Sequence, residues 1–109
     1  MEYSVKTIAV FEKQFRRLYR KFPSLKAEVL QIVQQLKSKP EAGVSIGNRC
    51  YKIRIAIKSK VKGKSGGARI ITHVVIRDQV VYLLSIYDKS EKADLSKSEL
   101  EFLLKEIES

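Results

Sequence analysis

The chain has 109 residues, of which 44% are hydrophobic, and its formal net charge is +10. This length and apolar content predict a single domain over residues 1–109 rather than a disordered basic tail. The single cysteine, Cys50, and the single histidine, His73, exclude an internal disulfide, a multi-cysteine zinc cage and a histidine-rich metal site. We therefore expect no metal and no cofactor.

The positive charge is unevenly distributed along the chain. Residues 1–87 carry 18 basic and 5 acidic side chains, whereas residues 88–109 carry 4 basic and 7 acidic ones. No acidic residue lies between Glu41 and Asp78, an interval rich in lysine and arginine. Such a surface is expected to meet phosphates, and the alternative is a solvated basic surface without a ligand. Because no apolar run is long enough to cross a bilayer and no cleavable signal pattern is present, we expect a cytoplasmic protein without membrane contact.

The N-terminal part of the sequence predicts one strand and two helices. Alternating apolar and polar residues over 2–8 are typical of a short strand. Apolar residues then recur every three or four positions over 11–22, which predicts an amphipathic helix. Pro23 suits the first turn of a second helix that runs to about Lys37, so the two helices form a hairpin. The loop that follows is marked by Pro40, Gly43 and Gly47.

The remaining sequence predicts three strands and a closing helix. From Tyr51 to Lys58 the residues alternate, with Tyr51, Ile53, Ile55 and Ile57 facing one way and mostly charged residues facing the other. Further strand patterns cover 68–77 and 80–87, and a basic loop over 59–67 separates them from the first of the three strands.

A capping box predicts the start of the last helix, because Ser96 is followed three residues later by Glu99. The order β-α-α-β-β-β-α predicts an α+β fold with a small, mostly antiparallel sheet. We expect the helical hairpin to cover one face of this sheet and the basic second face to be open to solvent.

Three local motifs do not support a separate chemistry. Gly63-Lys64-Ser65 lacks the glycine that a phosphate-binding P-loop requires five residues earlier, where Lys58 stands, and it joins two strands. His73 is more typical of a packed or edge histidine than of a general base, although it shares the face of Arg69. Cys50 is more typical of a small buried residue than of a nucleophile.

The candidate chemistry lies in cations on the open face. Arginine can bind a phosphate through two parallel hydrogen bonds, and a lysine crowded by other cations can act as a base because their charge lowers its pKa. Without histidine or paired carboxylates, this pattern predicts a nuclease whose substrate is held by something else, or a nucleic-acid binder without chemistry. The four candidate catalytic residues are Lys52, Arg54, Arg69 and Lys89.

Three segments carry a resemblance to a known family: Cys50–Ile55, Gly63–Ile71 and Ile86–Glu91. With them, the sequence resembles the RelE/ParE superfamily of bacterial toxins, and more closely its HigB-like branch. The resemblance implies a compact sheet with a helical hairpin, in the toxin of a type II toxin–antitoxin system. It also implies cleavage of messenger RNA in the decoding site of a translating ribosome, with the ribose 2′-hydroxyl attacking the adjacent phosphate.

The resemblance also implies roles for the four cations. Lys52 and Arg54 match the basic strand pair of the family, as general base and as stabiliser of the phosphate or oxyanion. Arg69 matches the arginine after the loop and is expected to clamp the scissile phosphate. Lys89 matches a late basic residue, as general acid at the leaving 5′-oxygen or as a second stabiliser of charge.

Two features depart from RelE proper. A tyrosine that stacks on RNA is replaced by Leu95, and Tyr87 is the candidate substitute. The basic loop from Lys58 to Lys64 is an insertion, which we expect to contact ribosomal RNA. The residues expected to bind RNA or the ribosome are Arg49, Lys58, Lys60, Lys62, Lys64 and Tyr87.

The expected partners are the ribosome with its message and a cognate antitoxin. The antitoxin is expected to carry an acidic or amphipathic segment and a DNA-binding portion, such as a helix-turn-helix, so that operator DNA is reached only through it. Two alternatives remain open. One is a ParE-like inhibitor that binds a DNA topoisomerase without catalysis. The other is a plain RNA-binding domain, which the acidic last helix disfavours.

Overall fold

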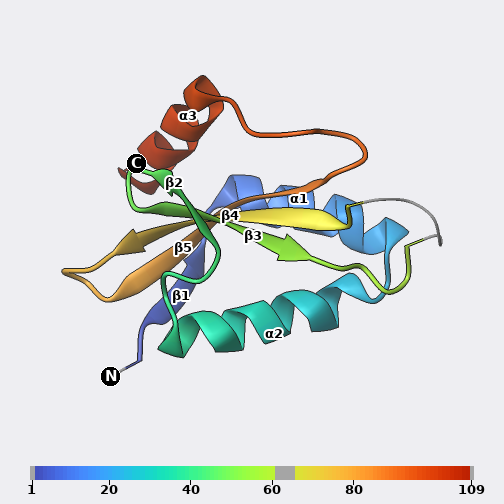
Figure 1. Cartoon of the computed structure of the whole chain (residues 1–109), viewed down its shortest axis with the longest axis horizontal. Helices are drawn as coiled ribbons and strands as arrows, with labels where there is room; N and C mark the ends of the chain where they lie inside the picture. The colour runs from blue at the N-terminus through green and yellow to red at the C-terminus, as the bar shows by residue number, and fades with distance from the viewer. Residues whose placement is uncertain (1, 61–65, 109) are drawn as a thin grey trace.

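The computed structural model describes residues 2–60 and 66–108. These residues form a five-stranded sheet in the order β1-β5-β4-β3-β2, together with three helices (Figure 1). Strand β1 pairs with β5 in parallel, and the other neighbours are antiparallel, so the predicted α+β class is confirmed. The strands are β1 (Ser4–Thr7), β2 (Val44–Gly47), β3 (Cys50–Ile55), β4 (Ala68–Val75) and β5 (Val80–Asp88). The helices are α1 (Ala9–Lys21), α2 (Leu25–Ser38) and α3 (Lys97–Glu108).

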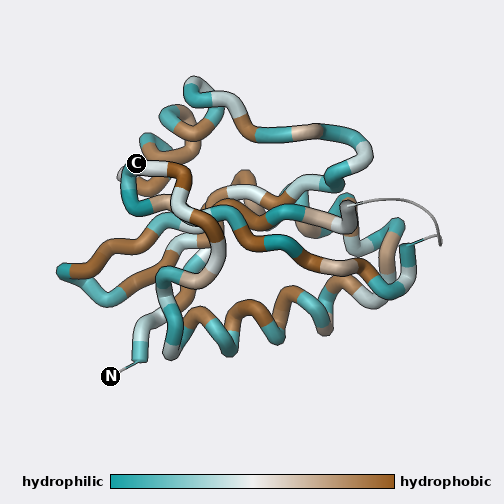
Figure 2. Tube along the Cα trace, viewed as in Figure 1, coloured by the Kyte–Doolittle hydropathy of each residue, from teal (hydrophilic) through white to brown (hydrophobic). Residues whose placement is uncertain are grey.

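The alternation predicted for β3 is present in the structure. Ile53 and Ile55 are buried, whereas Arg54 between them is exposed. Ile53 lies opposite Ile70, which lies opposite Ile86, so one row of buried apolar side chains crosses three strands. Helices α1 and α2 cover this face with their apolar sides, and Figure 2 shows hydrophobic and hydrophilic residues alternating along α2. The helical hairpin on one face of the sheet is therefore confirmed.

A β-bulge in β5 changes which residues share a face. Thr72 lies opposite Leu83, but the preceding residue, Ile71, lies opposite Ser85. Leu84 is therefore an extra residue in β5, and the alternation of side chains changes phase across it. As a result Ile86 joins the apolar face with Leu83, and Tyr87 lies on the opposite, basic face.

Strand β2 lies in a segment that the sequence predicts as loop. It forms a tight hairpin with β3, because Asn48 and Arg49 both adopt a φ of 55° between the two strands. Two consecutive residues with positive φ are characteristic of the type I′ turn, whose twist suits a hairpin. Asn48, a residue type that tolerates a positive φ at the first central position, is the sequence feature that could have indicated this turn.

Helix α3 packs on the opposite side of the sheet from α2 (Figure 1). It buries Leu100 and Leu103, and the predicted capping box is present: Glu99 N–H donates to Ser96 Oγ at 3.1 Å, and Ser96 N–H donates to Glu99 Oε1 at 2.8 Å. The second face of the sheet is therefore not fully open to solvent. In the described part of the chain, no helix has both the length and the apolar character needed to span a membrane.

We predict that Gly67→Ala strongly destabilises the fold. Gly67 has a φ of 52°, and a Cβ there would lie 2.1 Å from the carbonyl oxygen of Ile55. Left-handed strain and overpacking together should lower the free energy of unfolding by about 2 to 5 kcal/mol, measured by urea titration. Gly47→Ala is the matched control, because Gly47 also has a positive φ but open space around the position of a Cβ. An equal loss in the two variants would contradict the proposed clash.

Candidate functional site

The strand register brings three predicted site residues into one row. Arg54 of β3 lies opposite Arg69 of β4, and Arg69 lies opposite Tyr87 of β5. Directly opposite residues on neighbouring strands have Cβ atoms about 4.5–5.5 Å apart. Lys52 lies two positions before Arg54 on the same face, and Lys89 follows the end of β5. We call the four cations together with Tyr87 the cationic row.

Arg69 is the buried centre of the cationic row. It is only 7% exposed, and its Nη1 donates to the carbonyl oxygens of Gly66 and, at 3.1 Å, of Ala68. No carboxylate within the described ranges forms an ion pair with Arg69 or with Arg54 opposite it. Like charges placed directly opposite each other in a sheet are destabilising, and a buried charge without a counter-ion is costly. The arrangement therefore favours binding of an anion between the two arginines.

A segment following β5 crosses the edge of the cationic row. Lys89 Nζ donates to the carbonyl oxygen of Ala93 at 2.7 Å, and Lys52 Nζ lies 3.5 Å from Asp94 Oδ1. The Leu95 N–H and, to a smaller extent, Lys52 lower the pKa of the Asp94 carboxyl below its ordinary value. Asp94 is 68% exposed, so this ion pair contributes little to stability and can be displaced by another anion.

Tyr87 lies in the row, but its ring is not available for stacking. It is 5% exposed, and its hydroxyl has no hydrogen-bond partner among the described residues. Burial raises the pKa of the Tyr87 hydroxyl, and the Asp94 carboxylate raises it further. The expectation that Tyr87 stacks on an RNA base would require the ring to leave its buried position opposite Arg69.

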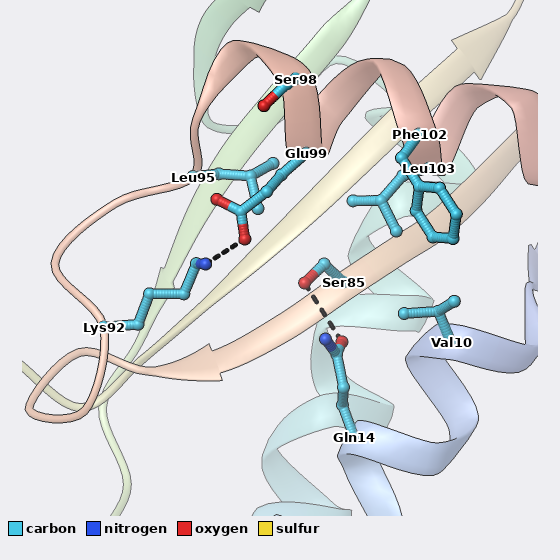
Figure 3. Close-up of a pocket in the computed structure, with 9 residues that line it drawn as sticks. All are labelled: Val10, Gln14, Ser85, Lys92, Leu95, Ser98, Glu99, Phe102 and Leu103. Atoms are coloured by element: carbon cyan, nitrogen blue, oxygen red, sulfur yellow. Dashed lines mark hydrogen bonds and ion pairs between the residues drawn. The ribbon is translucent and has the colours of Figure 1, made fainter.

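Ion pairs of Glu91 and Glu99, which the sequence pattern does not predict, hold the segment 89–96. Glu91 pairs with Arg17 at 2.7 Å and with Lys21 at 3.2 Å, which fixes the segment to α1. Lys92 pairs with Glu99 at the start of α3. Figure 3 shows this pair among the residues that line a pocket between α1, β5 and α3, which has a volume of about 360 Å³. The pocket contains none of the five residues of the cationic row.

Cys50 and His73 form a separate contact on the sheet. Cys50 Sγ lies 3.5 Å from His73 Nδ1. Burial raises the pKa of the Cys50 thiol to about 11, so it is a poor nucleophile, and burial lowers the pKa of His73. In the part of the chain that the structure describes, no group of three histidine, cysteine or acidic side chains could hold a metal ion.

Comparison with known proteins identifies the family. Residues 8–108 match the family described as the RelE toxin of the RelE / RelB toxin–antitoxin system. The chain belongs to the RelE toxin family. A solved structure of the E. coli toxin RelE, a mutant in the free state, has the same fold, with a TM-score of 0.59 and 19% sequence identity. The match covers 98% of this chain and 99% of that one.

The residues that the sequence predicts to bind RNA or the ribosome outside the cationic row lie at different places in the structure. Arg49 is exposed in the β2–β3 turn, about 16 Å of strand away from Arg54. Lys58 is exposed in the segment that follows β3. Lys60 is different, because its ammonium is buried against Asp88 and is not presented to a ribosomal phosphate. Lys62 and Lys64 lie outside the described residues.

We predict that Asp94→Asn lowers the pKa of Tyr87 in this RelE-family toxin. Removing the nearby negative charge makes the phenolate less unfavourable, whereas burial still holds the pKa above its ordinary value. An NMR titration with tyrosine labelled at the ring carbon that bears the hydroxyl measures this shift. Asp78→Asn, in the exposed β4–β5 turn, is the control and should leave the Tyr87 titration unchanged. An unchanged or higher Tyr87 pKa in Asp94→Asn would contradict an electrostatic effect of Asp94 on Tyr87.

Proposed function

We propose that this toxin is a ribosome-dependent endoribonuclease that cleaves messenger RNA and so inhibits translation. The observation that carries the proposal is the pairing of Arg54 with a buried Arg69, neither of which has a carboxylate partner among the described residues. A phosphodiester placed between them would supply the missing negative charge. Arginine is well suited to this task, because its planar guanidinium can donate two parallel hydrogen bonds to one phosphate.

The chemistry assigned to the row is an internal phosphoryl transfer. The 2′-oxygen of the ribose forms a bond to the adjacent phosphorus, and the bond from phosphorus to the 5′-oxygen breaks. The products are a 2′,3′-cyclic phosphate and a 5′-hydroxyl. Lys52, as the neutral amine, is the proposed acceptor of the 2′-hydroxyl proton, and Lys89, as the ammonium, is the proposed donor of a proton to the leaving 5′-oxygen. Arg54 and Arg69 would stabilise the charge that develops on the phosphoryl oxygens.

The cationic row lacks efficient acid and base groups, and this explains the proposed need for a ribosome. The row contains no histidine and no pair of carboxylates, which are the more efficient acid and base groups near neutral pH. A lysine-based site gains most from having the message held in a reactive geometry, and a ribosome would supply that positioning. In the free toxin Lys52 and Lys89 contact Asp94 and Ala93. These contacts would have to open when the message binds.

Membership of the RelE family implies a cognate antitoxin, and its contacts are part of the proposal. We expect an acidic or amphipathic segment of the antitoxin to bind the cationic row, or a neighbouring surface that blocks access to the ribosome. A DNA-binding portion of the antitoxin would carry the complex to operator DNA. If the antitoxin contacts the cationic row, dissociation of the toxin–antitoxin complex should depend on the salt concentration and on Arg54.

We predict that induced expression of the wild-type chain arrests growth and produces cuts in translated messages. Arg69→Ala should reduce cleavage on the order of 100-fold to 1,000-fold, because it removes a donor that stabilises the developing charge. Growth curves and mapping of message ends in the same cells measure both effects. Arg69→Lys keeps the charge but loses the two parallel hydrogen bonds, so it should remain folded and still cleave poorly.

Arg77→Ala is the control for this experiment. Arg77 is 91% exposed in the turn between β4 and β5, and its loss should leave arrest and cleavage unchanged. Growth arrest without message cuts would contradict the proposal and favour a ParE-like inhibitor of a topoisomerase. RNA binding without growth arrest would instead favour a plain RNA-binding domain.

A further inference from the structure

The one ion pair with both side chains buried, among the residues that the structure describes, joins Lys60 to Asp88. Lys60 Nζ lies 2.6 Å from Asp88 Oδ1, and the two side chains are 8% and 2% exposed. The Lys60 ammonium also lies 5.9 Å from the centre of the Phe22 ring. Both partners are removed from water, so neither charge is available to a large ligand in this conformation.

Asp88 organises the turn that carries Lys89. Its Oδ1 accepts hydrogen bonds from the Ser90 N–H at 2.9 Å and from the Ser90 hydroxyl at 2.8 Å. Its carbonyl oxygen accepts from the N–H groups of Glu91 and Lys92, each at 3.0 Å. Side chain and backbone of Asp88 together therefore define the path of the chain immediately after β5.

The same turn packs against the residues that precede Arg69. Lys89 N–H donates to the Gly67 carbonyl oxygen at 3.0 Å. A Cβ at Gly66 would lie 2.4 Å from Lys89 Cγ, so the lysine stem lies directly on the Gly66 backbone. Because the Gly66 carbonyl also accepts from Arg69, the positions of Lys89 and Arg69 are linked through this short stretch of chain.

The two residues that precede Lys60 are held by the start of helix α2. Glu28 accepts a hydrogen bond from the Lys58 N–H at 2.8 Å, and Ser24 Oγ accepts from the Ser59 N–H at 3.0 Å. These contacts fix the chain after β3 to the first turn of α2. The Lys60 side chain then connects this fixed segment to the end of β5.

We propose that Lys60 and Asp88 are positioning residues that hold Lys89 and Arg69 in register with the cations of β3. This inference rests on the proposed nuclease function for its catalytic consequence, but its structural part can be tested without activity. It assigns Lys60 a role different from the RNA contact expected from its place in a basic segment. The pair acts on the geometry of the row, and neither residue is assigned to the reacting atoms.

The energetics of buried ion pairs support a role in geometry. Desolvation of two charges often cancels their attraction, so such a pair is a weak source of stability. It does require one defined arrangement of both partners, because displacement of either leaves an uncompensated buried charge. Lys60 and Asp88 therefore favour a single position of the β5 end relative to the segment after β3.

The first experiment measures amide hydrogen exchange in the full chain, comparing wild type with Asp88→Asn and Lys60→Met. Positioning predicts at least tenfold faster exchange of the Lys89, Ser90 and Glu91 amides, with unchanged protection in the centre of β4. Lys60→Arg should restore slow exchange. Uniformly faster exchange across the sheet would show a general stabilising role and overturn the proposal, as would unchanged exchange in the turn.

The second experiment measures message cleavage in a translation reaction containing ribosomes. If Lys60 and Asp88 position Lys89 and Arg69, the single variants Asp88→Asn and Lys60→Met should lower kcat on the order of tenfold to a hundredfold, with KM little changed. The double variant Lys60→Met/Asp88→Asn removes both charges together, so its urea midpoint should approach that of wild type while kcat stays low. Recovery of both the urea midpoint and kcat in the double variant would overturn the positioning role.

Asp78→Asn is the matched control, because it removes a carboxylate from an exposed ion pair with Arg77. It should change neither exchange nor cleavage. If wild type itself leaves messages intact, the proposed nuclease function fails, whereas the exchange experiment still decides whether Lys60 and Asp88 position the turn. A rise in KM with unchanged kcat would contradict positioning and support the direct RNA contact expected of Lys60.

Discussion

The buried guanidinium of Arg69 lies between Arg54 on one neighbouring strand and Tyr87 on the other, without a carboxylate partner among the described residues. Two carbonyl oxygens, from Gly66 and Ala68, hold it in place, but they do not neutralise its charge. The sheet tolerates this buried charge without a counter-ion because a continuous apolar core on the opposite face stabilises the same three strands. The unbalanced charge is the physical basis of the proposed phosphate site.

The bulge at Leu84 is what allows a buried apolar strand to contribute to a polar site. With strict alternation Tyr87 would share a face with Leu83 and point into the helical layer. The extra residue reverses the phase, so that Ile86 enters the core and Tyr87 joins the arginines. Beyond the bulge, β1 no longer pairs with β5. Gln14 of α1 instead accepts a hydrogen bond from the Ile86 N–H at 3.0 Å. The irregular part of β5 is therefore supported from both sides.

Much of this architecture could be predicted from local sequence patterns, because period two in β3 and helical spacing in α1 and α2 report directly on which face is buried. The same periodicity places Lys52, Arg54 and Arg69 on one face. The bulge and the Lys60–Asp88 pair could not be predicted, since they depend on register and on contacts between residues 28 positions apart. Lys60 in particular belongs to a run of lysines whose composition indicates an exposed surface, yet its neighbour in space is an acid from the end of another strand. Likewise Asp94 lies in the acidic last segment, and only the fold places it beside Lys52.

In the proposed complex, the scissile phosphate of a message binds between Arg54 and Arg69. A structure of the toxin on a ribosome, with a message whose 2′-hydroxyl is methylated to prevent cleavage, tests this claim most directly. We expect phosphate oxygens within hydrogen-bond distance of the Arg69 guanidinium, with Lys52 released from Asp94. A message phosphate bound at another surface, with Arg69 unoccupied and the Lys52 contact intact, would contradict it.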